Sequence, residues 1–468
     1  MRLADILPDL TPLRTSRDFR AVFGSRTAAY LGTQAAEVAL VVQAKQLTNS
    51  PFVVGTLGLA ELVPLLVFGL FAGALADRLD RRKVIVWCEP GLAACAILLL
   101  VNALLPHPLL WPLYVIAAAM MSLSALQRPS FEAAIQRLVP PQQQTASAAL
   151  LSISMNAVVL AGSSLGGVLA ITPGPYSVYA LDAAGFLVSF ALLTRLPAMP
   201  RRAPGAGGTG GVAGDGGDAG SGGGARAIAA DILVGLRYAV GRKELLGSYV
   251  ADLIAMIFAY PNALLPFMAV LVHAPWAAGL LFAAPSAGAL LMSLTSGWMR
   301  RVRRHGLAIT VSAGCWGLAM AGLGLSSGIG VALLMLAIAG GADEASGIFR
   351  DVLWNQTIPN EIRGRMAGIE MLSYAAGPPT GQLRSGAVAA VAGIRFSLVT
   401  GGLACVAGVA VACAALPAFR RYRAAPGYRG VTAPGATTAP GAPPGDGTTL
   451  EDGGALAAQE ALHEAERA

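Results

Sequence analysis

Residues 59–86, LAELVPLLVFGLFAGALADRLDRRKVIV, decide the fold of this chain. The first part of the stretch is almost entirely apolar, and a helix needs about 20 such residues to cross a bilayer. The second part crowds Arg78, Arg81, Arg82 and Lys83 together directly after the apolar run. Such cations concentrate on the cytoplasmic side of membrane-spanning helices. We therefore interpret the stretch as a membrane span followed by a cytoplasmic connection.

The composition extends this interpretation to the whole chain. Of its 468 residues, 55% are hydrophobic and 13% are charged, against about 25% charged residues in a typical soluble domain. Apolar runs recur along the sequence, which predicts an all-α membrane protein. Twelve membrane-spanning helices are predicted, near 20–43, 52–76, 84–105, 109–131, 146–171, 176–197, 245–272, 276–298, 307–326, 329–352, 365–392 and 396–417.

Arginines crowd alternate connections between these predicted spans. Arg17 precedes the first span, Arg137 follows the fourth, Arg303 follows the eighth and Arg420 follows the last. By the positive-inside rule, both termini and the central loop are cytoplasmic. The net charge of +7 is thus explained by topology and not by nucleic-acid binding. We expect a multi-pass protein of the cytoplasmic (inner) membrane.

A Gly-rich stretch, 198–225, separates six predicted spans from six, and a tail rich in Pro, Gly, Ala and Thr follows the last span. Such compositions are typical of flexible linkers and disordered tails. We predict a cytoplasmic N-terminal segment (1–19), an N-terminal six-helix bundle (20–197), a cytoplasmic linker with an amphipathic helix (198–244), a C-terminal six-helix bundle (245–417) and a disordered cytoplasmic tail (418–468).

Weak internal similarity relates the two halves. GALADRLDRRKV at 73–84 has a degraded counterpart in GWMRRVRRHGLA at 297–308, and GSSLGG at 162–167 corresponds to GPPTGQ at 377–382. A repeat of roughly 220 residues in a membrane chain is typical of a two-bundle transporter whose site lies between the halves.

The segment from residue 73 to 83 resembles motif A of the major facilitator superfamily, GxLaDRxxRRk. The matching residues are Gly73, Asp77, Arg78, Arg81, Arg82 and Lys83. The resemblance implies the major facilitator fold, in which contacts of this motif latch one conformation. A simpler alternative is that the cations only set the membrane topology.

GSSLGG resembles the antiporter motif C, GPxxGG, of the same superfamily, with Ser163 in place of the proline. Gly162, Gly166 and Gly167 permit close helix packing, and packing alone is an equally good explanation. The fourth span lacks the midspan arginine of motif B, a motif found in many drug–proton antiporters.

Over nearly all its spans the chain resembles the enterobactin-exporter branch of this superfamily, on residues 18–26, 59–86, 102–110 and 362–370. The resemblance implies proton-driven export of a siderophore or a similar amphipathic small molecule. Multidrug and macrolide exporters share the architecture, and a non-transporting sensor can retain it. Expected partners are the small-molecule cargo, protons and membrane lipids.

Polar side chains within the first predicted span recur at helical spacing. Arg26, Tyr30, Gln34 and Glu37 form one polar stripe, as expected of a face that lines a wet cavity. Glu61 lies near the middle of the second span and could carry a proton, because burial disfavours a charged carboxylate. A structural partnership with a polar group on a neighbouring helix is the alternative.

Asp343 and Glu344 lie midway along the tenth predicted span. Adjacent helical residues point about 100° apart, so only one of the two is expected to face the cavity. A purely structural charge network with Arg350 is the alternative. Five further ionisable residues are expected closer to span ends, in pairs or at the membrane interface: Glu89, Asp182, Asp252, Glu370 and Arg384. Tyr260, Pro261 and Asn262 interrupt the seventh span.

A membrane-embedded enzyme is the competing functional class, and the sequence disfavours it. All four histidines lie in predicted connections or in the tail, and no nucleophile–base pattern, metal-ligand spacing or phosphate-binding loop is present. The five cysteines fall in apolar runs. We therefore expect no enzymatic activity, no cofactor, no bound metal and no nucleic-acid partner.

Overall fold

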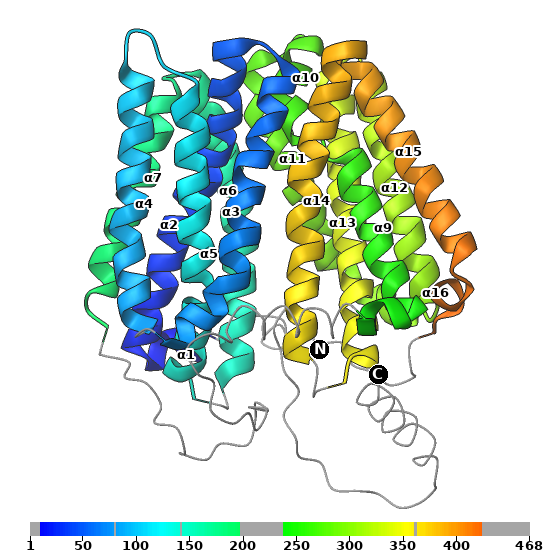
Figure 1. Cartoon of the computed structure of the whole chain (residues 1–468), viewed down its shortest axis with the longest axis horizontal. Coiled ribbons are helices and arrows are strands. Elements are labelled where there is room, and N and C mark those ends of the chain that lie inside the picture. Colours follow the sequence, from blue (N-terminus) through cyan, green and yellow to red (C-terminus); the bar gives the residue numbers. More distant parts are fainter. Residues whose placement is uncertain (1–9, 79–80, 141–142, 197–236, 360–362, 424–468) are drawn as a thin grey trace, which may run out of the picture. The chain divides into compact units, whose positions relative to one another are not determined.

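The computed structural model describes residues 10–78, 81–140, 143–196, 237–359 and 363–423, which fold into helices joined by short turns (Figure 1). No β-strand occurs in these ranges. In the N-terminal half the helices are α1 (Thr11–Thr15), α2 (Arg17–Thr48), α3 (Pro51–Arg78), α4 (Arg81–Leu104), α5 (Trp111–Leu138), α6 (Gln144–Ile171) and α7 (Pro175–Leu193).

The C-terminal half contains a second series of helices. They are α9 (Lys243–Ala259), η3 (Asn262–Leu264), α10 (Leu265–Leu271), η4 (Pro275–Ala277), α11 (Ala278–Thr295), η5 (Ser296–Arg301), α12 (His305–Leu325), α13 (Ile329–Thr357), α14 (Arg363–Ala392), α15 (Ile394–Ala415) and α16 (Pro417–Arg421). These bounds follow the apolar runs of the sequence to within a few residues.

Nine helical segments in the described part of the chain are long and apolar enough to cross a membrane. The three other long helices at predicted spans, α2, α5 and α14, contain more polar residues along their lengths. The multi-pass membrane class is therefore confirmed, while the count of twelve spans stays a prediction.

The seventh predicted span is broken where the sequence indicated. α9 ends at Ala259, and a short 3-10 turn, η3, precedes α10. Proline lacks the backbone N–H that a continuing helix needs, so Pro261 favours a break. The Asn262 side-chain amide donates a hydrogen bond to the Tyr260 hydroxyl at 2.8 Å. This contact fixes a polar bend in an otherwise apolar span.

Each half packs mainly on itself. α2 contacts α6 and α7, and α4 contacts α5 and α7; in the other half, α12 contacts α13 and α15. The largest apolar cluster draws its buried members from residues 239–419, whereas the second draws nearly all of its members from residues 35–179. The exceptions in the second cluster are Ala263 and Phe267, which extend from the C-terminal half into it.

Two helix pairs join the halves, α3 with α14 and α6 with α11. Small residues allow these helices to approach closely, because their backbones touch. A Cβ on Gly55 of α3 would meet the Gln382 backbone of α14, and a Cβ on Gly58 would meet Pro379. Gly167 of α6 contacts Gly279 of α11 in the same way. All these contacts lie nearer the helix ends that are remote from the α3–α4 connection.

Candidate functional site

A cavity of ≈ 70 Å³ lies between α2, α3, α4 and α5. Thr33, Glu37, Glu61 and Ser124 supply its polar lining. The rest of the lining is apolar: Ala36, Leu40, Leu99, Ala117, Met120 and Met121. At about 30 Å³ for each water in the liquid, this volume holds a few waters. The cavity thus brings two predicted carboxylates together at membrane depth.

Glu37 is the exposed residue in an otherwise covered segment. All the other residues of α2 from Gly32 to Ala44 are buried or half-buried. Glu61 is half-buried and lies close enough to Glu37 for the two carboxylates to interact electrostatically. Like charges at such range repel each other.

Tyr260, at the bend after α9, connects this pair to the C-terminal half. It interacts electrostatically with Glu37, Glu61 and Asp343. Carboxylates of three different helices, α2, α3 and α13, therefore interact electrostatically with one tyrosine. Tyr260 is the first residue after α9, at the break that separates α9 from η3.

Asp343 and Glu344 are adjacent on α13 but have different surroundings. Asp343 interacts electrostatically with Tyr260 and Arg350. The Glu344 carboxylate accepts a hydrogen bond from the Ser293 hydroxyl of α11 at 2.6 Å. Asp343 therefore belongs with the Glu37–Glu61 group, whereas Glu344 joins α13 to α11.

A buried ion pair extends the network beyond Asp343. The Arg350 guanidinium of α13 is paired with the Asp252 carboxylate of α9, and both side chains are buried. The Arg350 guanidinium also lies 5.9 Å from the ring centroid of Trp354. Trp354 in turn donates to the Ser248 hydroxyl at 3.0 Å and stacks on Tyr249. The pair is thus held on both sides by side chains of α9 and α13.

The predicted polar stripe on α2 is divided between two environments. Tyr30 interacts electrostatically with Arg26 and Glu37. Gln34 is buried, and a Cβ on Gly162 of α6 would meet its side chain. Arg26, Tyr30 and Glu37 therefore share one electrostatic group, while Gln34 packs against α6.

The glycine pattern of α6 lies at two helix contacts. Gly162 and Gly166 face α2, where a Cβ on Gly166 would meet the Ala35 backbone. Gly167 faces α11, at Gly279. The same short pattern therefore packs α6 within its own half and against the other half.

The motif A residues lie at the end of α3 and the start of α4. The side chains of Gly73, Asp77, Arg78 and Arg81 fall outside the described part of the structure. The Arg82 guanidinium donates to the backbone carbonyl of Thr194 at 2.9 Å, and Lys83 is exposed. Arg82 thereby joins α4 to the end of α7.

Glu89, Asp182 and Asp252 are all buried in the helix packing, and Asp252 is paired as expected, with Arg350. Glu89 accepts a hydrogen bond from the Gln127 amide at 2.8 Å. Asp182 lies about 10 Å along α7 from its first residue, at 1.5 Å per residue.

Asp182 differs from the other buried carboxylates, because neither of its oxygens has a hydrogen-bond partner in the described residues. The nearby Thr33 hydroxyl donates to the Ala29 carbonyl at 3.1 Å instead. A Cβ on Gly32 would meet the Asp182 side chain, and Asp182 interacts electrostatically with Glu37. Asp182 therefore lies beside the Glu37–Glu61 pair.

Metal binding has no candidate site in the described ranges, where no three His, Cys, Asp or Glu side chains are grouped suitably. The five cysteines are free thiols. The chemistry that this arrangement can support is proton binding and release by carboxylates in a membrane interior, next to a cavity that can take up water.

Residues 8–207 match the model of a family described as "Transmembrane secretion effector". The enterobactin exporter of Citrobacter koseri is 28% identical over 90% of this chain and 97% of its own. The exporter of the same name from Salmonella paratyphi A is 29% identical over 82% of this chain and 89% of its own.

Solved structures share the fold at lower identity. A bacterial homologue of the human lysosomal transporter Spinster, in an inward-facing and unoccupied conformation, matches with a TM-score of 0.66 and 15% identity, over 88% of this chain and 99% of that one. A POT family transporter in complex with 5-aminolevulinic acid matches with a TM-score of 0.67 and 11% identity, over 86% and 97%. These similarities establish the fold.

Proposed function

We propose, from the premise that this chain is a transporter of the major facilitator superfamily resembling the enterobactin exporters, that it exports a siderophore from the cytoplasm. It is a transport protein and not an enzyme. The observation that carries the proposal is the similarity to the Citrobacter koseri exporter along 97% of that protein. A match over 90% of this chain extends into both helical halves.

Proton coupling is the second part of the proposal. Glu37, Glu61 and Asp343 gather around Tyr260 from three helices, and a carboxylate held in a low-dielectric site exchanges a proton with little change in structure. Entry of a proton would remove one negative charge from the group, and its release would restore the full charge repulsion there. Such a cycle can drive cargo outward against its gradient, which makes the protein an antiporter.

Alternating access is the third part. Its support is that α3 contacts α14 and α6 contacts α11 at one end of the helices, where the two halves meet. Rocking of two six-helix bundles would separate these pairs and open that end. The ≈ 70 Å³ cavity is far smaller than the hundreds of Å³ typical of a ligand pocket, so the cargo requires such an opening.

The arginine distribution supports a location in the cytoplasmic (inner) membrane with both termini in the cytoplasm. In that orientation the α3–α4 connection, with Asp77 and its neighbouring cations, faces the cytoplasm. Motif A would then bias the balance between the two open states.

One feature of the cavity favours a second cargo class. Met120 and Met121 line it beside Ala117 and Leu99, and flexible thioether side chains adapt to varied apolar ligands. Multidrug or macrolide efflux is therefore the alternative function, with the same transport cycle.

Uptake into inside-out vesicles tests the cargo. Vesicles containing the protein would be energised with a proton gradient and supplied in parallel with a radiolabelled catecholate siderophore or a macrolide. Accumulation of the siderophore alone supports the proposal, whereas accumulation of the macrolide alone supports the alternative. Gradient-dependent uptake of neither, in vesicles that contain folded protein, contradicts both.

A pair of matched variants tests the coupling. Glu61→Gln should abolish gradient-driven accumulation while leaving cargo exchange down its own gradient, because an amide cannot release a proton. Glu244→Gln changes a carboxylate that pairs with Arg242 near the start of α9, outside the cavity, and should accumulate cargo at the wild-type rate. Equal accumulation by the two variants would contradict a coupling role for Glu61.

A further inference from the structure

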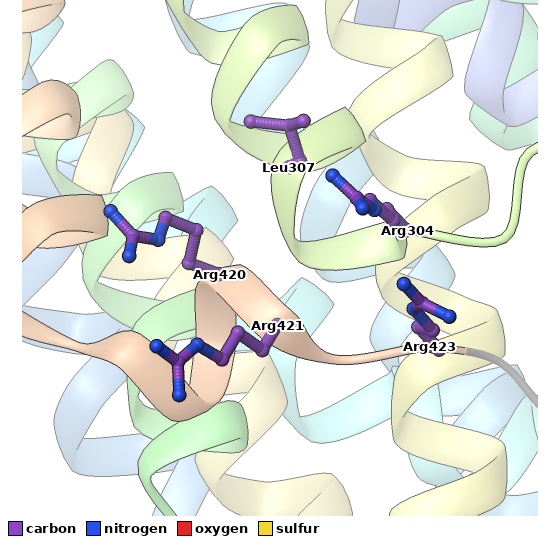
Figure 2. Close-up of a pocket in the computed structure, with 5 residues that line it drawn as sticks. All are labelled: Arg304, Leu307, Arg420, Arg421 and Arg423. Atoms are coloured by element: carbon purple, nitrogen blue, oxygen red, sulfur yellow. The ribbon is translucent and has the colours of Figure 1, made fainter.

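A second pocket, of ≈ 620 Å³, lies at the start of α12 and beside α16. Four arginines and one leucine line it: Arg304, Arg420, Arg421, Arg423 and Leu307. In Figure 2, Arg304 and Arg423 lie on one side of the space, and Arg420 and Arg421 lie on the other. The pocket is remote from the carboxylate group and has no part in the proposed transport cycle.

The position of α16 is built into the fold. Phe419 is fully buried, and a Cβ on Gly247 of α9 or on Gly306 of α12 would meet it. The Tyr422 hydroxyl donates to the Gln356 side-chain carbonyl of α13 at 3.0 Å. These anchors hold the arginines of residues 420–423 beside Arg304, which is more than a hundred residues earlier in the chain.

The charged side chains that line the pocket are all positive. Among the residues that the structure describes, no carboxylate lines it, and Arg242 and Arg350 form their ion pairs elsewhere. Arg304 is also the N-cap residue of α12, and the first backbone N–H groups of a helix add partial positive charge there. Four guanidinium groups around one open space repel one another until an anion occupies it.

We propose that this pocket binds a phosphate-bearing anion, and that its source is the headgroup of an anionic phospholipid. Guanidinium groups match phosphate oxygens in geometry and charge. Leu307, on the pocket wall, is 39% exposed, so apolar surface adjoins the arginines. Apolar and basic groups together at the end of a spanning helix suit a lipid at the membrane interface.

Soluble phosphate is the other source of the same chemistry, and solvated arginines that only set topology would bind neither. Binding of short-chain phosphatidylglycerol to the purified full chain in neutral detergent, followed by microscale thermophoresis, separates these cases. Phosphatidylcholine and inorganic phosphate serve as parallel ligands. We expect saturable binding of phosphatidylglycerol, no saturation by phosphatidylcholine, and no competition from millimolar inorganic phosphate.

Matched double variants locate the site. Arg304→Gln with Arg423→Gln should weaken phosphatidylglycerol binding by about tenfold or more, because charge-assisted hydrogen bonds are lost. Arg301→Gln with Arg303→Gln removes two exposed arginines from the preceding segment that do not line the pocket, and should change the affinity less than about twofold. Arg304→Lys with Arg423→Lys should bind phosphatidylglycerol with intermediate affinity, because lysine retains the positive charge but lacks the planar guanidinium that matches phosphate oxygens.

Each outcome decides the proposal. If inorganic phosphate competes with phosphatidylglycerol and Arg304→Gln with Arg423→Gln weakens binding, the pocket is a phosphate site. The proposal that a lipid headgroup supplies the phosphate is then overturned. Equal losses in both glutamine pairs, equal binding of phosphatidylcholine, or no saturable binding to folded wild-type protein would overturn the site itself.

Discussion

Gly167 of α6 and Gly279 of α11 lie so close that a Cβ on either would overlap the backbone of the other. The two residues belong to different halves of the chain, so their contact joins the halves directly. A side chain at this point must push the two helices apart.

Gly167→Ala should therefore lower the thermal stability of the purified protein, although alanine normally favours a helix over glycine by roughly 1 kcal/mol. Gly314→Ala in α12 is the matched control, because nothing lies within 4 Å of a Cβ added there, and it should leave the unfolding temperature unchanged or raise it. Measurement of both unfolding temperatures in detergent checks this. Equal stabilisation of the two variants would contradict the close α6–α11 contact.

The Arg350–Asp252 pair should be costly to break. Arg350→Met leaves the Asp252 carboxylate buried without its partner and should destabilise the protein by about 3–5 kcal/mol. Arg350→Met with Asp252→Leu should recover much of that loss, because the Asp252 carboxylate is no longer left without its partner. Denaturant unfolding followed by tryptophan fluorescence measures the differences.

An exposed pair provides the control for that prediction. Arg242 and Glu244 lie 3.6 Å apart with 51% and 21% of their side chains exposed. Arg242→Met should cost about 1 kcal/mol or less. Similar losses from Arg242→Met and Arg350→Met would contradict the buried pairing.

The buried Tyr179–Gln43 hydrogen bond should also stabilise the N-terminal half. The Tyr179 hydroxyl of α7 donates to the Gln43 side-chain carbonyl of α2 at 2.7 Å, and both residues are buried. Tyr179→Phe leaves that carbonyl unsatisfied and should cost about 1–3 kcal/mol. Tyr176→Phe, at a largely exposed position of the same helix, should be neutral. Unfolding transitions that coincide for the two variants would contradict this role.

A substitution that keeps the size of the side chain tests the Glu89–Gln127 contact. Gln127→Met keeps the length of the side chain but removes the amide that donates to Glu89 at 2.8 Å and to the Ile85 carbonyl at 3.1 Å. We expect a loss of about 1–3 kcal/mol in the free energy of unfolding. Gln127→Met with Glu89→Met should be more stable than the single variant, and a further additive loss would show that the two side chains do not interact.

Helix positions could be predicted from the sequence because apolar length is a local property. The break at Tyr260, Pro261 and Asn262 could be predicted for the same reason, since proline acts on its own helix. The partners of buried carboxylates are not local. Glu89 meets Gln127 from the next helix, so nothing near Glu89 in the sequence indicated burial.

The candidate site shows the same division. A midspan position marked Glu37, Glu61 and Asp343 as candidates, and their meeting around Tyr260 depends on how four helices pack. Asp182 is buried against Gly32 of α2, a contact that nothing within its own helix indicates. The arginine pocket could not be predicted, because Arg304 and Arg423 become neighbours only when Phe419 is seated against Gly306.

Proton movement coupled to cargo tests the central claim most directly. The purified protein would be reconstituted in liposomes that carry a pH gradient and a pH-sensitive dye, and a catecholate siderophore would be added. We predict that the siderophore accelerates the collapse of the gradient in the wild type and in Glu244→Gln, but not in Glu61→Gln. A gradient that decays at the same rate with and without siderophore in the wild type would contradict proton-driven siderophore export.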